Sequence, residues 1–196
     1  MHEVLLKTYA ALPPCDVKEI FRYAGGKGDA DATTHARIQE CIARAEPVLS
    51  YKACYLSLSL PEFFSVFGES ALARTRLDGA ERAVIFAASL GIGLDRLVAR
   101  YAGGETSKAL LLQALGAERI ESLCDEFCKT LAAEYAAQGF SVGKRFSAGY
   151  GDFPLESQRK FFTLLDCGRK IGLTLNESLL MSPSKSVTAA VGIFKK

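Results

Sequence analysis

The chain of 196 residues is 49% hydrophobic and 23% charged, which is typical of a globular protein that buries a core. A formal net charge of +2 and the lack of a basic run argue against nucleic-acid binding. The longest apolar run, Ala83 to Leu94, is shorter than the ~20 residues of a membrane-spanning helix, and no secretory cleavage site follows the opening residues. We therefore expect a cytoplasmic protein that binds neither nucleic acid nor a membrane.

The N-terminal part, residues 1–48, is predicted to be mainly helical. Its opening residues have the pattern of a strand or packing segment. Asp16 is expected to cap a helix that ends at Tyr23, and a glycine-rich exposed loop follows. Residues 35–49 repeat apolar positions at three- and four-residue spacing, which predicts an amphipathic helix that ends near Pro47.

The middle of the chain alternates between predicted strands and helices. Residues 51–60 alternate in polarity as a half-buried strand does, and residues 83–91 have the pattern of a buried strand. The longest helical pattern covers residues 106–138, and Gly116 marks a place where this helix could break. Shorter helices are predicted at residues 69–77 and at residues 94–102, the second closed by Gly103 and Gly104.

The C-terminal part predicts one helix and a hairpin. The helix covers residues 155–165 and is expected to be started by Asp152 and Pro154. The hairpin would join strands at residues 173–181 and 186–194 through the turn SPSK. We therefore predict a single α+β domain over residues 1–196, with helices packed on a twisted, mainly antiparallel sheet.

Most of the residue patterns that suggest chemistry are better explained by structure. Gly91 and Gly93 form half a dinucleotide fingerprint, but a tight strand-to-helix turn explains them better. Cys124 and Cys128 could share a metal, yet both lie on or beside the apolar stripe and no further ligands follow at suitable spacing. We expect reduced, buried thiols, no metal site and no catalytic nucleophile. The two histidines, His2 and His35, are too isolated to form a site.

The segment from Arg145 to Pro154 carries the strongest functional signal. Arginine can hold a carboxylate with two parallel hydrogen bonds. Gly149 and Gly151 allow close backbone approach, and Tyr150 between them brings a flat face and a hydroxyl. This set suits a ligand with a carboxylate at one end and an aromatic ring at the other. A glycine turn with the arginine in a surface ion pair explains the composition equally well.

The same segment resembles the activation domain of cobalamin-dependent methionine synthase, and more closely the small free-standing proteins related to it. The family pattern is R-x-x-x-G-Y, a proline-started helix, a T-E-S-like strand, and a proline turn into a strand that reads S-V. The matching residues, spread over residues 145–193, are Arg145, Gly149, Tyr150, Pro154, Glu177, Ser178, Pro183, Ser186 and Val187.

The resemblance implies a helmet-like fold and a ligand. In methionine synthase this domain binds S-adenosylmethionine in a shallow groove, and a flavodoxin supplies an electron for reductive methylation of the cobalamin. Carried over, Arg145 would hold the methionine carboxylate, the backbone around Ala148 and Gly149 would meet the nucleoside, and Tyr150 would line the pocket. The partner would be a separate methionine synthase or another corrinoid protein that carries the cobalamin.

Three departures from the family pattern bear on ligand binding. The enzyme's domain continues into a further ligand-contacting segment, whereas this sequence ends at Lys196. An early ligand-binding aspartate has only Asp16 as a candidate counterpart. The loop reads Phe146, Ser147, Ala148 where the enzyme has P-A-P.

These departures leave two main hypotheses and a third. The first is a stand-alone reactivation module that presents S-adenosylmethionine to a corrinoid protein, as an accessory component of the methyltransferase. The second is a docking module for the corrinoid protein that no longer binds S-adenosylmethionine. The third is an independent enzyme for another small carboxylate, for which Glu177 is the only candidate acid or base; a cap or pair within the hairpin explains Glu177 better.

Overall fold

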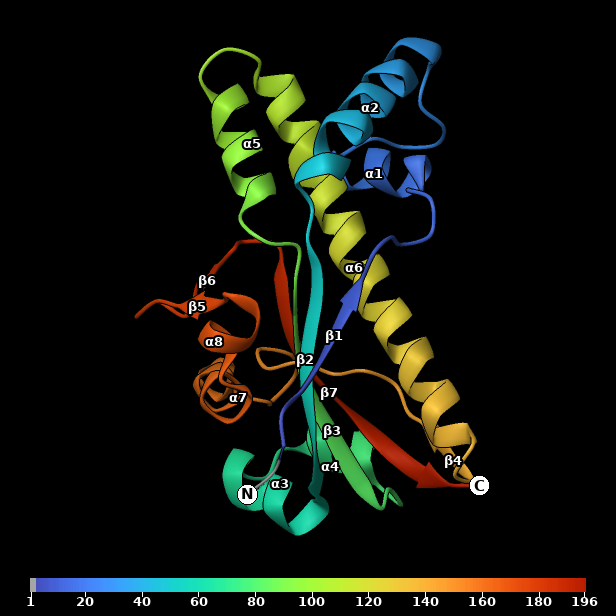
Figure 1. The fold of residues 1–196 in the computed structure, drawn as a ribbon, viewed down its shortest axis with the longest axis vertical. Helices are drawn as coiled ribbons and strands as arrows, with labels where there is room; N and C mark the ends of the chain where they lie inside the picture. The colour runs from blue at the N-terminus through green and yellow to red at the C-terminus, as the bar shows by residue number, and fades with distance from the viewer. Residues whose placement is uncertain (1–2) are drawn as a thin grey trace.

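A five-stranded antiparallel sheet forms the centre of the protein, as a computed structural model describes it over residues 3–196. The strand order is β1 (Leu5–Tyr9), β2 (Tyr51–Ser59), β3 (Arg82–Ser89), β7 (Ser186–Lys195) and β4 (Phe140–Val142). Every neighbouring pair is antiparallel. The sheet is strongly twisted, and helices cover both of its faces (Figure 1). The α+β prediction is confirmed.

Alternate residues of the central strands feed two separate hydrophobic clusters. In β3, Val84 and Phe86 join the first cluster, whereas Ala83 and Ile85 join the second. This alternation is what a strand buried on both faces requires. The first cluster includes residues of α1 (Val17–Tyr23), α2 (Ala32–Ala45), α5 (Gly93–Ala102) and α6 (Thr106–Ala136); the second includes residues of α3 (Leu60–Phe67), α4 (Ala71–Leu77), α7 (Gln158–Leu165) and α8 (Cys167–Ile171).

Several predicted elements are confirmed with small shifts at their ends. Asp16 caps α1, where its side chain accepts hydrogen bonds from the backbone N–H groups of Lys18 and Glu19. Helix α2 begins after its own cap, Asp31, and a short 3₁₀ helix (Glu46–Val48) takes the chain past Pro47. The N-terminal strand, the two central strands and α5 also form where the patterns place them.

The suggested break in the long helix is wrong. Helix α6 is continuous for 31 residues and crosses the sheet, with α1, α2 and α5 packed against its N-terminal half (Figure 1). A Cβ on Gly116 would lie 2.5 Å from Leu94 Cδ2 and 2.8 Å from Lys185 Cγ. The glycine therefore allows a close approach of neighbouring side chains instead of ending the helix. No described helix is long and apolar enough to span a bilayer.

The predicted C-terminal hairpin is also wrong. Residues 173–181 form only the short strand β5 (Thr174–Leu175), a turn, and the start of β6 (Met181–Ser182), and these two strands pair with each other. Strand β7 pairs instead with β3 and β4. The reason is burial: β7 is covered on both faces, so it takes an interior place in the sheet, whereas the turn between β5 and β6 is exposed.

The sequence reading missed three elements: α3, α8 and β4. Helix α3 had a readable signal, because Ser59 and Glu62 form a reciprocal capping box and Pro61 stands in the first turn. The predicted strand over residues 51–60 ran one residue into this helix. Helix α8 and strand β4 are five and three residues long, too short for a periodic pattern to show.

Candidate functional site

A groove of about 540 Å³ opens along the free edge of β7. Strand β4 pairs only with residues 193–195 of β7, and Phe146 then exchanges two backbone hydrogen bonds with Ala190. Beyond this bridge the chain leaves the sheet. The first residues of β7 therefore have no strand beside them on this side, within the described part of the chain. The groove is lined by Leu72, Arg76, Glu121, Arg145, Phe146, Ser147, Ala148, Tyr150, Gly151, Gln158, Met181, Ser186, Val187 and Thr188.

The backbone of Thr188 faces this open edge. Odd-numbered residues of β7 bond toward β3, as the hydrogen bond from the Glu81 N–H to the Ile193 carbonyl shows, and even-numbered residues such as Ala190 bond toward β4. The N–H and C=O of Thr188 consequently point toward the groove, and no described residue pairs with them. Thr188 is almost fully buried, so these polar groups form part of the floor of the groove.

The loop after Phe146 is fixed by its backbone. Gly149 has φ +88° and Gly151 has φ +57°, both in the region that favours glycine. The Gly149 N–H donates to the Phe153 carbonyl at 2.8 Å, and the Phe153 N–H donates to the Tyr150 carbonyl at 3.0 Å. Phe146 and Phe153 are both buried in the second cluster. The loop is thus anchored at both ends while Tyr150, 69% exposed, stays at the rim.

Asp152 anchors the loop to α4, which corrects the prediction that it starts the following helix. Its carboxylate accepts hydrogen bonds from the backbone N–H groups of Leu72 and Ala71, at 2.9 and 2.5 Å. These two bonds, that of Leu72 first, hold the pKa of Asp152 below its usual value. After Pro154 a short 3₁₀ helix (Leu155–Ser157) leads into α7 without a side-chain cap from Asp152.

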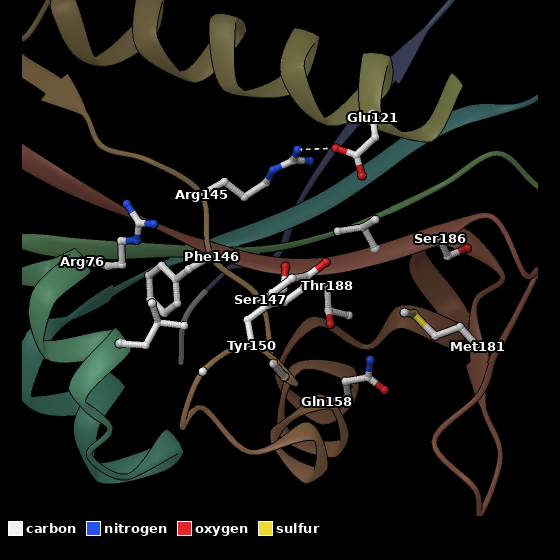
Figure 2. Close-up of a pocket in the computed structure, with 14 residues that line it drawn as sticks. Arg76, Glu121, Arg145, Phe146, Ser147, Tyr150, Gln158, Met181, Ser186 and Thr188 are labelled. Atoms are coloured by element: carbon white, nitrogen blue, oxygen red, sulfur yellow. Dashed lines mark hydrogen bonds and ion pairs between the residues drawn. The ribbon is translucent and has the colours of Figure 1, made fainter. Parts of the chain in front are cut away.

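Arg145 uses only part of its guanidinium within the protein. Its Nη2 donates to Glu121 on α6 at 2.6 Å (Figure 2). The same nitrogen lies 3.7 Å from Asp125. Its Nη1 is buried and has no hydrogen-bond partner among the described residues. The ion pair that the sequence allowed is therefore present, and one donor atom remains for a ligand.

The charge of Arg145 is secure. Burial works against the positive charge, but the neighbouring sulfur of Cys124 and the carboxylate of Glu121 more than offset burial, so the pKa of Arg145 is raised. Burial also raises the pKa of Cys124 to about 12 and that of Cys128 above its usual value. Both cysteines are therefore neutral thiols near pH 7, whereas a metal ion is bound by the thiolate form. No group of three or more potential metal ligands occurs within residues 3–196.

The structure brings together most, but not all, of the predicted site residues. Arg145, Ala148 and Tyr150 line the groove, and Gly149 shapes the loop without lining it. Glu177 is exposed in the turn between β5 and β6, does not line the groove, and contributes its carbonyl oxygen to a hydrogen bond from Arg159 at 2.9 Å.

The remaining candidates lie elsewhere. Asp16 is occupied as the cap of α1 and does not line the groove. A Cβ on Gly93 would lie 2.2 Å from the Val48 carbonyl oxygen, which supports a tightly packed turn over a phosphate cradle. His35 is exposed near the start of α2, and His2 lies outside the described residues.

Sequence reasoning missed four polar residues that line the groove: Arg76, Glu121, Gln158 and Thr188. Arg76 on α4 has no ion-pair partner among the described residues. Gln158 is 7% exposed, and its buried Oε1 has no hydrogen-bond partner within residues 3–196. No spacing in the sequence connects these residues with Arg145, because β7, α4, α6 and α7 meet only in the folded chain.

Comparison with known proteins agrees with this architecture. The sequence profile of the vitamin B12 dependent methionine synthase activation domain matches residues 73–194. No curated protein is similar enough in sequence to be matched. Among solved structures, the crystal structure of the MetH reactivation domain bound to AdoHcy is similar, with a TM-score of 0.64 over 97% of this chain and 78% of that chain. At 14% identity this likeness shows the fold alone.

The profile match covers more than half of the chain and includes the whole Arg145–Tyr150 motif. The chain belongs to the family of vitamin B12 dependent methionine synthase activation domains.

Proposed function

We propose that this protein is a stand-alone reactivation module that binds S-adenosylmethionine in the groove beside β7. The observation that carries the proposal is the buried, unpaired Nη1 of Arg145, a residue that lines the groove and is the first residue of the family motif. A buried guanidinium nitrogen without a partner is rare in a folded protein, and a ligand carboxylate would satisfy it. The solved relative holds AdoHcy, a ligand of the same chemical class.

The residues of the groove suit a zwitterionic ligand that carries an aromatic base. Arg145 would take the carboxylate through Nη1 while Nη2 keeps its bond to Glu121. The Glu121 carboxylate, 46% exposed, would face the ligand's ammonium group. Backbone around Ala148 and Gly149 would approach the nucleoside, and the exposed ring of Tyr150 would cover it. These residues bind and orient the methyl donor; the cobalamin supplies the nucleophile.

The proposed partner is a separate cobalamin-carrying methionine synthase or another corrinoid protein, in the cytoplasm, with a flavodoxin-like protein as electron donor. A partner must be able to reach the methyl group, and the rim of the groove is accessible at Tyr150. Leu180, in the neighbouring turn between β5 and β6, is also 66% exposed. We further propose that residues 1–196 act as one domain, because both hydrophobic clusters pack on the same sheet.

The direct test is calorimetric titration of the protein with S-adenosylmethionine. Ser147→Trp should abolish binding, since Ser147 is only half-buried and a large ring there would fill the groove. Thr75→Trp on the exposed surface of α4 is the matched control and should bind as the unaltered protein does. Saturable binding that only Ser147→Trp removes supports the proposal. A lack of binding at millimolar ligand would overturn it.

One observation favours the second candidate, a docking module that does not hold the nucleoside. Glu121 already neutralises Arg145 at 2.6 Å, as in a purely structural ion pair. In that case Arg145→Ala would leave the affinity for the corrinoid protein unchanged, and S-adenosylmethionine would not alter it. Pull-down of a cobalamin-loaded methionine synthase with and without S-adenosylmethionine separates the two functions.

A further inference from the structure

We propose that the side-chain amide of Gln158 recognises the amino-bearing edge of the ligand's adenine base. This inference rests on the proposed function and adds a second recognition point to the same groove. It assigns to Gln158 a role in choosing the base, whereas Arg145 chooses the amino-acid end.

The first support is that the buried Oε1 of Gln158 has no hydrogen-bond partner among the described residues. Over residues 3–196, three buried side-chain nitrogen or oxygen atoms lack a partner, and two of them, Arg145 Nη1 and Gln158 Oε1, belong to residues that line this groove. A glutamine that stabilises a fold normally satisfies its buried amide. Gln158 is 7% exposed, so leaving its oxygen unpaired is unfavourable unless something else binds there.

The second support is the position of Gln158. Figure 2 shows Arg145 and Gln158 on opposite sides of the groove, with Ser147 and Thr188 between them and Met181 beside Gln158. A ligand that places its carboxylate on Arg145 would therefore bring its other end toward Gln158. In S-adenosylmethionine that other end is the adenine base, and the Met181 thioether is a suitable neighbour for an aromatic ring.

The third support is chemical. An adenine edge presents an amino donor next to a ring-nitrogen acceptor, and a glutamine amide presents one acceptor next to one donor, so the two groups pair through two hydrogen bonds. The Oε1 of Gln158 is not held by a hydrogen bond from any described residue. The amide can therefore turn about its last torsion to place the oxygen toward the base.

The test compares two ligands that differ only in the amino group. S-adenosylhomocysteine and its analogue with an unsubstituted purine base are titrated by calorimetry into the unaltered protein, Gln158→Met and Arg145→Ala. In the unaltered protein the loss of the amino group should weaken binding about tenfold, because a buried acceptor is left unpaired. Gln158→Met should bind S-adenosylhomocysteine about tenfold more weakly and should bind both ligands equally. Arg145→Ala should weaken the binding of both ligands and leave the ratio of their dissociation constants unchanged.

Two further arms keep the inference separate from folding and from the proposed function. Gln158→Glu retains an acceptor oxygen and should keep the preference for the amino group; urea unfolding of both Gln158 variants shows whether they fold. If the unaltered protein binds both ligands equally, or if Gln158→Met keeps the ratio, the assignment of Gln158 is wrong although the groove is a nucleoside site. If S-adenosylhomocysteine does not bind at all, the proposed function fails and the assignment falls with it.

Discussion

Replacement of Arg145 by alanine separates binding from stability. The Arg145 and Glu121 side chains are 23% and 46% exposed, so their ion pair is partly solvated and is worth about 1 kcal/mol or less to folding. Removal of the arginine leaves a carboxylate that water can reach, and no charge becomes buried without a partner. We therefore expect the free energy of unfolding to fall by no more than about 1 kcal/mol, a small part of the stability of a domain of this size.

The expected effect on ligand binding is larger. A hydrogen bond between a charged donor and a carboxylate contributes about 1.5–3 kcal/mol, which corresponds to a dissociation constant roughly 10- to 150-fold higher in Arg145→Ala. Arg145→Lys keeps the charge but replaces the planar guanidinium by a single ammonium group, so its dissociation constant should lie between those of the unaltered protein and Arg145→Ala. Arg22→Ala is the matched control, because it removes an equally close arginine–glutamate pair on α1, outside the groove.

Calorimetric titration with S-adenosylmethionine and urea unfolding of the same preparations measure the two effects. The reasoning is refuted if the affinity of Arg145→Ala for S-adenosylmethionine is within about twofold of that of the unaltered protein, because the ligand would then make no important bond with Nη1. It is also refuted if the loss of apparent affinity in Arg145→Ala is fully explained by a smaller fraction of folded protein in that variant. A loss in Arg22→Ala equal to that in Arg145→Ala would show that the effect comes from net charge.

Three further outcomes follow from the same structure. Gly149→Ala should lower the free energy of unfolding by about 1–3 kcal/mol in urea, because φ is +88°, whereas Gly104→Ala, which meets no atom within 4 Å, should not. Asp152→Ala should speed amide hydrogen exchange in the first turn of α4; unchanged exchange would contradict its anchoring role. The pKa of Cys124 is about 12 in the folded state and about 9 in the unfolded state. Above about pH 9 the folded state therefore keeps a proton that the unfolded state loses. The free energy of unfolding should then fall as pH rises, by up to about 1.4 kcal/mol for each pH unit. Urea unfolding of Cys124→Ala from pH 8 to pH 11 should show a shallower decline than the unaltered protein.

The parts of the fold that depend on neighbours in sequence could be predicted, and the parts that depend on distant packing could not. The cap of α1 by Asp16 and the central strands follow from local patterns. Gly116 looked like a helix breaker in the sequence. A glycine is needed there because Leu94 and Lys185, which belong to other elements, approach the helix closely. The C-terminal hairpin failed because local polarity cannot tell which strand β7 will pair with.

The site divides in the same way. The residues from Arg145 to Tyr150 are consecutive, so their composition and their family resemblance were both visible. Gln158 and Thr188 enter the groove through α7 and β7, and their meaning comes from polar groups left unpaired after the chain has folded. Unpaired buried atoms are a property of packing, and no sequence pattern reports them.

The spacing of the family motif has a structural cause in this chain. Phe146 bridges to Ala190 in an extended conformation, so its neighbour Arg145 must point to the opposite face of the sheet. Phe146 accordingly enters the second cluster, and Arg145 reaches Glu121 on α6. A shift of one residue would turn the guanidinium into the aromatic cluster and the ring toward α6, on the opposite face of the sheet. Beyond the bridge the chain must turn away from β7, and Gly149 supplies the positive φ for that turn. The arginine and the glycine therefore stand four residues apart because one is fixed by the last bridge to the sheet and the other by the turn that opens its edge.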